Sequence, residues 1–184
     1  FMGLVGSEMC IRDRFYTYIN KSHSFSNILD LKSLKKDIDS GLYFKSNIPI
    51  SSGLGSSGAL VSSILTNYSN TDLSKKDSNE IKKIMSIMES KFHGKSSGFD
   101  PLVSFFNKPI MMSDGNIKLI EDIKFRGFKI YLVDSKIPSS TSDMITIFNQ
   151  KMTDENFLNL FNNSFIPITN NCIHNLINLS LIHI

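Results

Sequence analysis

The sequence predicts a globular chain that mixes helices and strands, and three observations support this. Hydrophobic residues make up 41% of the 184 residues, which suits a core for one ordinary domain, or one domain plus part of another. Apolar residues recur at helical spacing in several runs. The turn-like stretch S-D-G-N at 113–116 separates two short apolar runs, which is typical of a β-hairpin.

The first third of the chain is predicted to form helix, strand, loop and helix in that order. Leu31–Ile38 is predicted as a short helix with Asp30 as its N-cap. A strand is expected over Leu42–Ile48, before a loop rich in glycine and serine. The helix that follows, Ala59–Tyr68, carries apolar residues at helical spacing: Leu60, Val61, Ile64 and Leu65.

The next helix is expected to begin with Ser78 as its cap, after a polar loop. Its apolar positions follow the i, i+3, i+4, i+7 pattern of one buried face: Ile81, Ile84, Met85 and Met88. The runs 109–112 and 117–120 form the predicted hairpin, and Phe128–Val133 is predicted as another strand. Three further helices are expected: Asp143–Lys151, Asp154–Asn162 and Asn170–Asn178.

Charge and cysteine content exclude several classes of protein. The net charge is only +3 and the lysines are scattered, so we expect no nucleic-acid partner. We expect no membrane partner either, because no stretch is apolar enough to span a bilayer and no signal-peptide pattern opens the chain. Cys10 and Cys172 are too few for a disulfide scaffold, which favours the cytoplasm.

The most informative stretch is Pro49–Ala59, which reads P-I-S-S-G-L-G-S-S-G-A and opens a helix. Glycines let a backbone approach an anion closely, and the positive end of a helix dipole favours negative charge. Serine hydroxyls can add hydrogen bonds to phosphate or a ligand to Mg²⁺. The stretch therefore predicts a phosphate-binding loop, although a serine-rich helix cap without a ligand is a simpler alternative.

Two other nucleotide motifs fit this loop less well. Gly53, Gly55 and Gly58 satisfy G-x-G-x-x-G, but the acidic residue expected about 20 positions later would be Asp77 or Glu80, at a helix start instead of a strand end. This disfavours a dinucleotide-binding domain. The Walker pattern fails because Ala59 stands where its lysine should be.

Three residues after the loop carry candidate chemistry. Glu89 lies at the edge of the buried stripe, so its carboxylate needs a partner such as Mg²⁺ unless it is a solvated surface residue. His93 is expected to end its helix beside Gly94 as C-cap, because no zinc-type partner stands at a useful spacing. Asp100 precedes Pro101, which suits an N-cap at the start of another helix.

Two motifs together give a family resemblance. P-x-x-x-G-L-G-S-S-x-A, from Pro49, resembles the ATP phosphate-binding motif of the GHMP kinases. E-S-K-F-H-G-K-S-S-G-F-D, over Glu89–Asp100, resembles the E-x-x-x-H-G-x-x-S-G-x-D block of mevalonate kinases, except that Ser96 stands where they usually have proline. The similarity continues loosely to Tyr131–Thr141, a strand and a turn that ends in threonine, with Ser139 where the family often has a basic residue.

The resemblance implies an α+β fold of two domains with the active site between them. Residues 15–125 would be part of the ATP-binding N-terminal domain, and residues 126–178 the start of the C-terminal domain. It implies ATP and Mg²⁺ as cofactors. The phosphate loop would comprise Pro49, Gly53, Leu54, Gly55, Ser56, Ser57 and Gly58.

The remaining site roles also come from the resemblance. Ser57 and Glu89 would hold Mg²⁺, and Asp100 would accept the proton of the substrate hydroxyl. Substrate contacts are expected at His93, Gly94 and Thr141.

Both ends of the chain resemble translated adapter sequence. V-G-S-E-M-C-I-R-D-R at 5–14 and L-S-L-I-H-I at 179–184 carry this resemblance, so residues 1–14 and 179–184 are expected to lie outside the natural protein. The fold would then be incomplete at both ends. We expect the intact parent protein to be an enzyme, and this chain alone to be inactive or nearly so.

The expected reaction is phosphorylation of mevalonate by ATP to give 5-phosphomevalonate. Phosphomevalonate kinase or another GHMP small-molecule kinase is the nearest alternative, since an S-G-x-D block also occurs in the phosphomevalonate branch. A non-catalytic GHMP-fold binding protein is the alternative outside the enzymes. The expected partner is a small-molecule alcohol, and the sequence leaves a homodimer open.

Overall fold

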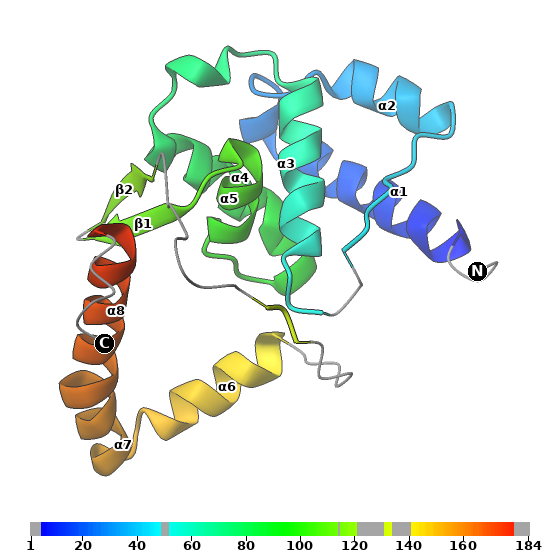
Figure 1. Ribbon diagram of the computed structural model, residues 1–184. Coiled ribbons are helices and arrows are strands. Elements are labelled where there is room, and N and C mark those ends of the chain that lie inside the picture. Colours follow the sequence, from blue (N-terminus) through cyan, green and yellow to red (C-terminus); the bar gives the residue numbers. More distant parts are fainter. Residues whose placement is uncertain (1–4, 49–51, 114, 121–130, 134–140, 179–184) are drawn as a thin grey trace.

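The chain, seen in a computed structural model, is described over residues 5–48, 52–113, 115–120, 131–133 and 141–178. Its architecture is mostly helical, with one small antiparallel sheet (Figure 1). The first elements are α1 Val5–Lys21, a 3₁₀ turn at His23–Phe25, α2 Leu31–Asp39, α3 Ser56–Tyr68, a 3₁₀ turn at Leu73–Lys75 and α4 Ser78–His93. They are followed by α5 Phe99–Phe106, β1 Ile110–Ser113, β2 Asn116–Leu119, α6 Thr141–Lys151, α7 Glu155–Leu160, a π-helical turn at Phe161–Phe165 and α8 Ile166–Asn178.

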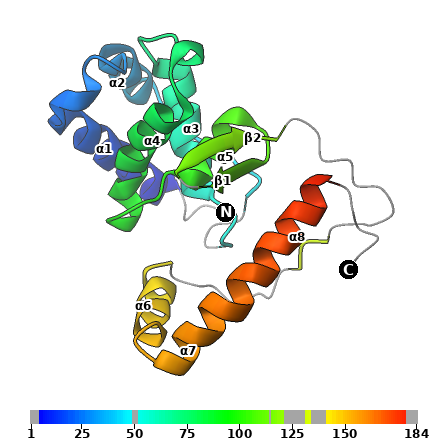
Figure 2. The ribbon, with the colours of Figure 1, turned by 90° about the vertical axis from the view of Figure 1, so that its left-hand side faces the viewer.

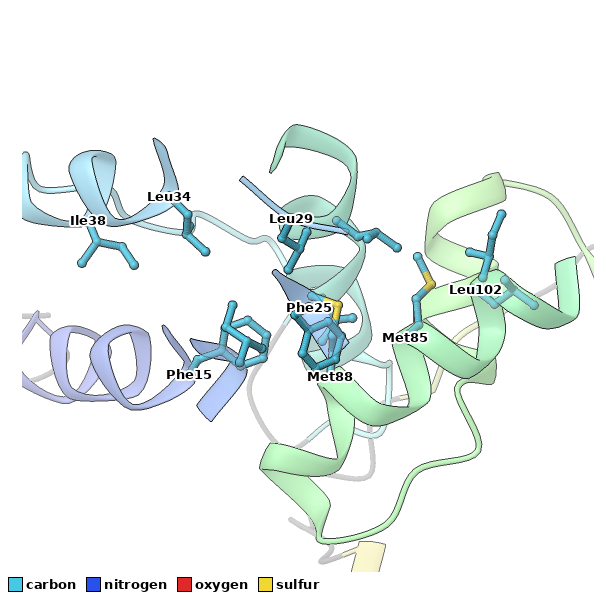
Figure 3. Packing of buried hydrophobic residues seen from close by; sticks show 12 residues of the cluster. Phe15, Phe25, Leu29, Leu34, Ile38, Met85, Met88 and Leu102 are labelled. Atoms are coloured by element: carbon cyan, nitrogen blue, oxygen red, sulfur yellow. The ribbon is translucent and has the colours of Figure 1, made fainter. Parts of the chain in front are cut away.

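Five helices and their connections enclose one hydrophobic core. Helix α3 packs against α2, α4 and α5, while α1 packs against α2 and α4. The buried side chains come from every one of these helices and from the segment between α1 and α2 (Figure 3). They are Phe15, Ile19, Phe25, Leu29, Leu34, Ile38, Val61, Leu65, Ile81, Met85, Met88 and Leu102.

The predicted apolar stripes are confirmed. On α4, Ile81, Met85 and Met88 are fully buried and Ile84 packs partly buried against the same core. On α3, Val61 and Leu65 are buried at 0% exposure. Burying a side chain of this size contributes about 1.5–3 kcal/mol, so these stripes fix which face of each helix points inward.

Hydrogen bonds fix helix α2 near both of its ends. The Asp30 carboxylate accepts a hydrogen bond from the Ser33 amide at 3.0 Å, which confirms the predicted N-cap. The Tyr68 hydroxyl at the end of α3 donates to Asp37 Oδ2 at 2.7 Å. Burial, and then this hydrogen bond, raise the pKa of Tyr68 to about 12, so the phenol remains a donor at neutral pH.

The predicted hairpin forms, and it pairs β1 with β2 in antiparallel register. Ile110 lies opposite Leu119, and Ser113 lies opposite Asn116. The partly buried Ile110 and Ile117 pack against the core. The small sheet together with the helices agrees with an α+β class.

Three predictions are wrong in the described residues: the strand at 42–48, the described part of the strand at 128–133, and the cap of α4. Residues 42–48 form no strand: the Leu42 amide donates to Asp37 O at 2.8 Å, and no neighbouring strand offers the pairing that an extended segment needs in the described ranges. Residues 131–133 form no strand either, and residues 128–130 lie outside the described ranges. Helix α4 begins at Ser78, but its cap is Asp77, whose carboxylate accepts from the Asn79 amide at 2.9 Å.

The three predicted C-terminal helices are present as α6, α7 and α8. Asp154 caps α7 by accepting from the Phe157 amide at 2.8 Å. Figure 2 shows these helices as an arm beside the body made by α1–α5. The proposed boundary between two domains falls among residues 121–130, outside the described ranges. Of the helices in the described part of the chain, none combines the length and apolar character that crossing a bilayer requires.

Candidate functional site

The predicted phosphate loop leads directly into α3. Gly55 takes the N-cap position of α3 with φ +69°, and Gly53 has φ +72°. Both angles lie in the left-handed region, which glycine adopts at little cost. Gly55 offers no side chain to cap the helix, and no side-chain cap hydrogen bond is formed there. The N-cap position of α3 is therefore held by a glycine and not by one of the serines of the loop.

The members of the predicted loop differ in their environments. Leu54 is 42% exposed, Ser56 and Ser57 are half-buried, and Gly58 is buried. Pro49 lies outside the described residues. The loop backbone is therefore accessible on one side, while the first turn of α3 packs against the helices behind it.

Helix α5 approaches the start of α3 very closely, and this brings Asp100 to the loop. A β-carbon added to Gly55 would lie 3.3 Å from Asp100 Cβ and 3.5 Å from Asp100 Oδ2. A β-carbon added to Gly58 would lie 2.7 Å from the Pro101 nitrogen and 2.8 Å from the Asp100 carbonyl carbon. Only glycine fits at position 58, so the third glycine of the loop permits the helix contact that places Asp100 there.

Asp100 lies in the first turn of α5 and is not its N-cap, contrary to the prediction. The cap is Gly98 with φ +76°, and the helix begins at Phe99. Glycine adopts a left-handed φ at little cost, so Gly98 can serve as the cap. The helix therefore begins one residue before Asp100, and Pro101 is its third residue. The Asp100 side chain is exposed, so it is accessible to a ligand at the loop.

Glu89 is buried on α4 with only 4% of its surface exposed, so the alternative that it is a solvated surface residue is wrong. Its Oε1 accepts a hydrogen bond from the Ser57 hydroxyl at 2.9 Å, and its Oε2 accepts one from the Ser96 hydroxyl. The predicted Ser57–Glu89 pair is therefore in direct contact, across helices α3 and α4. Within the described part of the chain, the ion pairs formed by lysines do not involve Glu89.

The residues fit Mg²⁺, the metal that the sequence predicts. A buried carboxylate normally needs a compensating group, and Ser57 and Glu89 supply the oxygen ligands that Mg²⁺ prefers. Mg²⁺ commonly takes one or two protein ligands and completes its shell with phosphate oxygens and water.

A turn between α4 and α5 supports Glu89 and was missed by sequence reasoning. The Ser96 hydroxyl accepts from the Gly98 amide at 2.9 Å while donating to Glu89, and the Ser86 hydroxyl donates to Ser96 O at 2.6 Å. A β-carbon on Gly98 would lie 2.5 Å from Lys82 O. The sequence offered one signal, the serine at the position where the resembling family has proline.

We expect Gly98→Ala to lower the free energy of unfolding far more than Gly115→Ala. The two glycines have φ angles of +76° and +78°. Alanine at either position would therefore cost about 1–2 kcal/mol of stability, because its β-carbon disfavours a left-handed backbone. Position 115 has nothing within 4 Å of an added β-carbon, whereas position 98 meets backbone. In Gly98→Ala this clash should lower the free energy of unfolding by about a further 1–3 kcal/mol. Urea unfolding of both variants measures the difference. Equal losses would show that the turn does not pack against α4.

The predicted substrate contacts are only partly placed. Gly94 is the C-cap of α4, with φ +71° and its amide donating to Ser90 O at 2.8 Å, as predicted. His93 ends α4 and Thr141 begins α6, but their side chains lie outside the described atoms. The structure therefore brings together the loop, Ser57, Glu89 and Asp100, while the substrate contacts remain predictions.

A shallow depression does not coincide with this cluster. Its volume is about 220 Å³, and its lining is Asn79, Lys82, Lys83, Ser86 and Ser97. Lys82 lies over the Phe99 ring at 5.1 Å from the centroid. Geometry and burial at the start of α3 locate the site better than the size of this hollow.

Comparison with known proteins adds one finding. Residues 18–108 match the family profile described as the GHMP kinases N terminal domain. This range contains the glycine loop, Glu89 and Asp100, and the match supports the GHMP kinase family. No curated protein and no solved structure matches the chain significantly.

Proposed function

We propose, from the support for the GHMP kinase family over residues 18–108, that the protein transfers the terminal phosphoryl group of ATP to the hydroxyl of a small-molecule alcohol. One observation carries this proposal. Helices α3, α4 and α5 bring Ser57, Glu89 and Asp100 together at the glycine loop. Phosphoryl transfer needs aligned reactants, neutralised charge and an acceptor for the hydroxyl proton. In this proposal the loop would align the phosphates, Mg²⁺ held by Ser57 and Glu89 would neutralise their charge, and Asp100 would accept the proton.

The phosphates of ATP would lie at the start of α3. The backbone of Gly53 and Gly55 lets an anion approach, and the first-turn amides of a helix favour negative charge. Ser56, the first residue of α3, would add a hydroxyl to the phosphates. The 13 residues of α3 give it a full helix dipole at this end.

Ser57 and Glu89 would hold Mg²⁺. Their side chains already contact each other at 2.9 Å, and both are oxygen ligands. When bound, the ion would neutralise the negative charge that builds up on the phosphate oxygens. The buried position of Glu89 limits competition from water for its carboxylate.

Asp100 would act as the proton acceptor. As the hydroxyl oxygen bonds to the terminal phosphorus and the bond to the bridging oxygen breaks, the hydroxyl proton passes to the Asp100 carboxylate and ADP leaves. The carboxylate is exposed at the edge of the loop, where both the acceptor alcohol and the phosphate could reach it.

We infer that the acceptor is mevalonate. The support is the E-x-x-x-H-G-x-x-S-G-x-D spacing from Glu89 to Asp100, in which His93-Gly94 favours mevalonate over phosphomevalonate. Another GHMP small-molecule kinase is the nearest alternative. In this proposal residues 126–178 begin a second domain of a longer parent protein, and Thr141 contacts the substrate.

A binding protein of the same fold without turnover is the second candidate. Such a protein could keep the glycine loop for a nucleotide, but it would need neither a buried carboxylate beside Ser57 nor Asp100 at the loop. The presence of both acidic residues in one cluster favours the kinase.

A coupled ADP-release assay on the parent protein tests the proposal. Mevalonate, phosphomevalonate, homoserine and galactose would be offered in turn with ATP and Mg²⁺. We expect ADP release to depend on both acceptor and Mg²⁺ and to be fastest with mevalonate. A reaction without acceptor measures background hydrolysis of ATP.

Two other results would change the conclusion in different ways. Turnover with another alcohol would reject mevalonate and keep the kinase. ATP binding without ADP release for any acceptor would favour the binding protein.

A further inference from the structure

The Ser96 hydroxyl occupies a connecting position in the cluster. It donates to Glu89 Oε2 and accepts from the Gly98 amide at 2.9 Å, so it bridges the side chain of one helix and the backbone that begins the next. Ser96 is half-buried, and its own carbonyl accepts from the Ser86 hydroxyl at 2.6 Å. The turn is therefore anchored on α4 at two points.

Ser96 completes the fixation of the Glu89 carboxylate. Ser57 binds one oxygen and Ser96 binds the other, and these two serines come from different segments. A glutamate side chain has several rotatable bonds, and ordering it costs conformational entropy. With both oxygens engaged before a ligand arrives, the carboxylate is held near Ser57.

Ser96 also connects Glu89 to the helix that carries Asp100. Its acceptor bond holds the Gly98 amide, and Gly98 is the N-cap of α5, two residues before Asp100. Gly98 packs against Lys82 O and Ser86, so α5 begins at a fixed place on α4. A shift of this turn would move Asp100 relative to both Glu89 and the glycine loop.

We propose that Ser96 is a positioning residue that orients Glu89 toward Mg²⁺ bound with ATP and sets its place relative to Asp100. This inference rests on the proposed function. It assigns to Ser96 a role that acts through Glu89 and Gly98, without contact with the reacting atoms. Groups that hydrogen-bond a metal-binding carboxylate typically change metal affinity about 10–100-fold when they are removed.

The test compares Ser96→Ala with Ser90→Ala in the parent protein. Ser90 lies beside Glu89 on α4, but its hydroxyl donates to Ser86 O in its own helix at 2.7 Å. ATP is titrated calorimetrically at a series of Mg²⁺ concentrations. The quantity compared is the Mg²⁺ concentration at which half of the Mg²⁺-dependent gain in ATP affinity is reached. We expect Ser96→Ala to raise this concentration about 10–100-fold and Ser90→Ala to leave it near the wild-type value.

A second pair of variants separates positioning from folding. Ser96→Thr keeps the hydroxyl. Ser96→Val introduces a side chain of nearly the same shape as threonine but without the hydroxyl. We expect threonine to retain most of the Mg²⁺ affinity and valine to lose it, while hydrogen exchange of the Gly98 amide is slow in the first and fast in the second. This comparison decides the question even if Ser96→Ala does not fold.

The outcomes distinguish this inference from the proposed function. If Mg²⁺ fails to strengthen ATP binding in the wild-type protein, the proposed function fails. If Mg²⁺ strengthens binding in the wild type and the half-saturating concentration is the same in the threonine and valine variants, Ser96 has no positioning role.

Discussion

Asp100→Asn is expected to lower the turnover of the parent protein by about 10²–10⁴-fold while leaving ATP binding largely in place. Asparagine has the size of aspartate, so the close packing of α5 on the start of α3 is kept. It cannot take the hydroxyl proton, however, and a loss of this size corresponds to about 3–5 kcal/mol in the activation free energy. The measurements are ADP release with the best acceptor and calorimetric titration with ATP.

Asp77→Asn is the matched control for this change. Asp77 caps α4 at the far end from Glu89, and asparagine caps helices about as well as aspartate does. We expect the control to keep near-normal turnover. Near-normal turnover in Asp100→Asn as well would remove Asp100 from the mechanism.

Part of the site's geometry could be predicted because its residues lie in short local patterns. The position of Glu89 at the edge of an apolar stripe indicated burial, which the structure confirms, while phosphate binding by the glycine loop stays a prediction. The contact between Ser57 and Glu89 came from a family resemblance, and the structure has these side chains hydrogen-bonded.

The features that were missed depend on contacts between distant segments. No local pattern shows that Ser96 reaches Glu89, or that a β-carbon at Gly58 would meet the backbone of α5. The predicted strand at 42–48 failed for the same reason, since β-propensity is satisfied only when another strand lies alongside. The cap of α5 was misplaced because the left-handed φ of Gly98 is set by its packing against α4.

The second large effect is expected for Glu89→Gln. The glutamine amide is neutral and offers one acceptor oxygen where the carboxylate offers two, and Glu89 now accepts from both Ser57 and Ser96. Because Mg²⁺ prefers charged oxygen ligands, the variant should lose the contribution of Mg²⁺ to ATP binding. The phosphate contacts proposed for the glycine loop would not involve this side chain, so the affinity for ATP without metal should change little.

The most direct test of the central claim is therefore ATP titration of wild-type and Glu89→Gln parent protein, each with Mg²⁺ and with a chelator. The claim is that the glycine loop, Ser57 and Glu89 together hold a magnesium-bound nucleotide. We predict that Mg²⁺ tightens ATP binding by at least about tenfold in the wild type and has almost no effect in the variant. An equal tightening by Mg²⁺ in both proteins would contradict this claim.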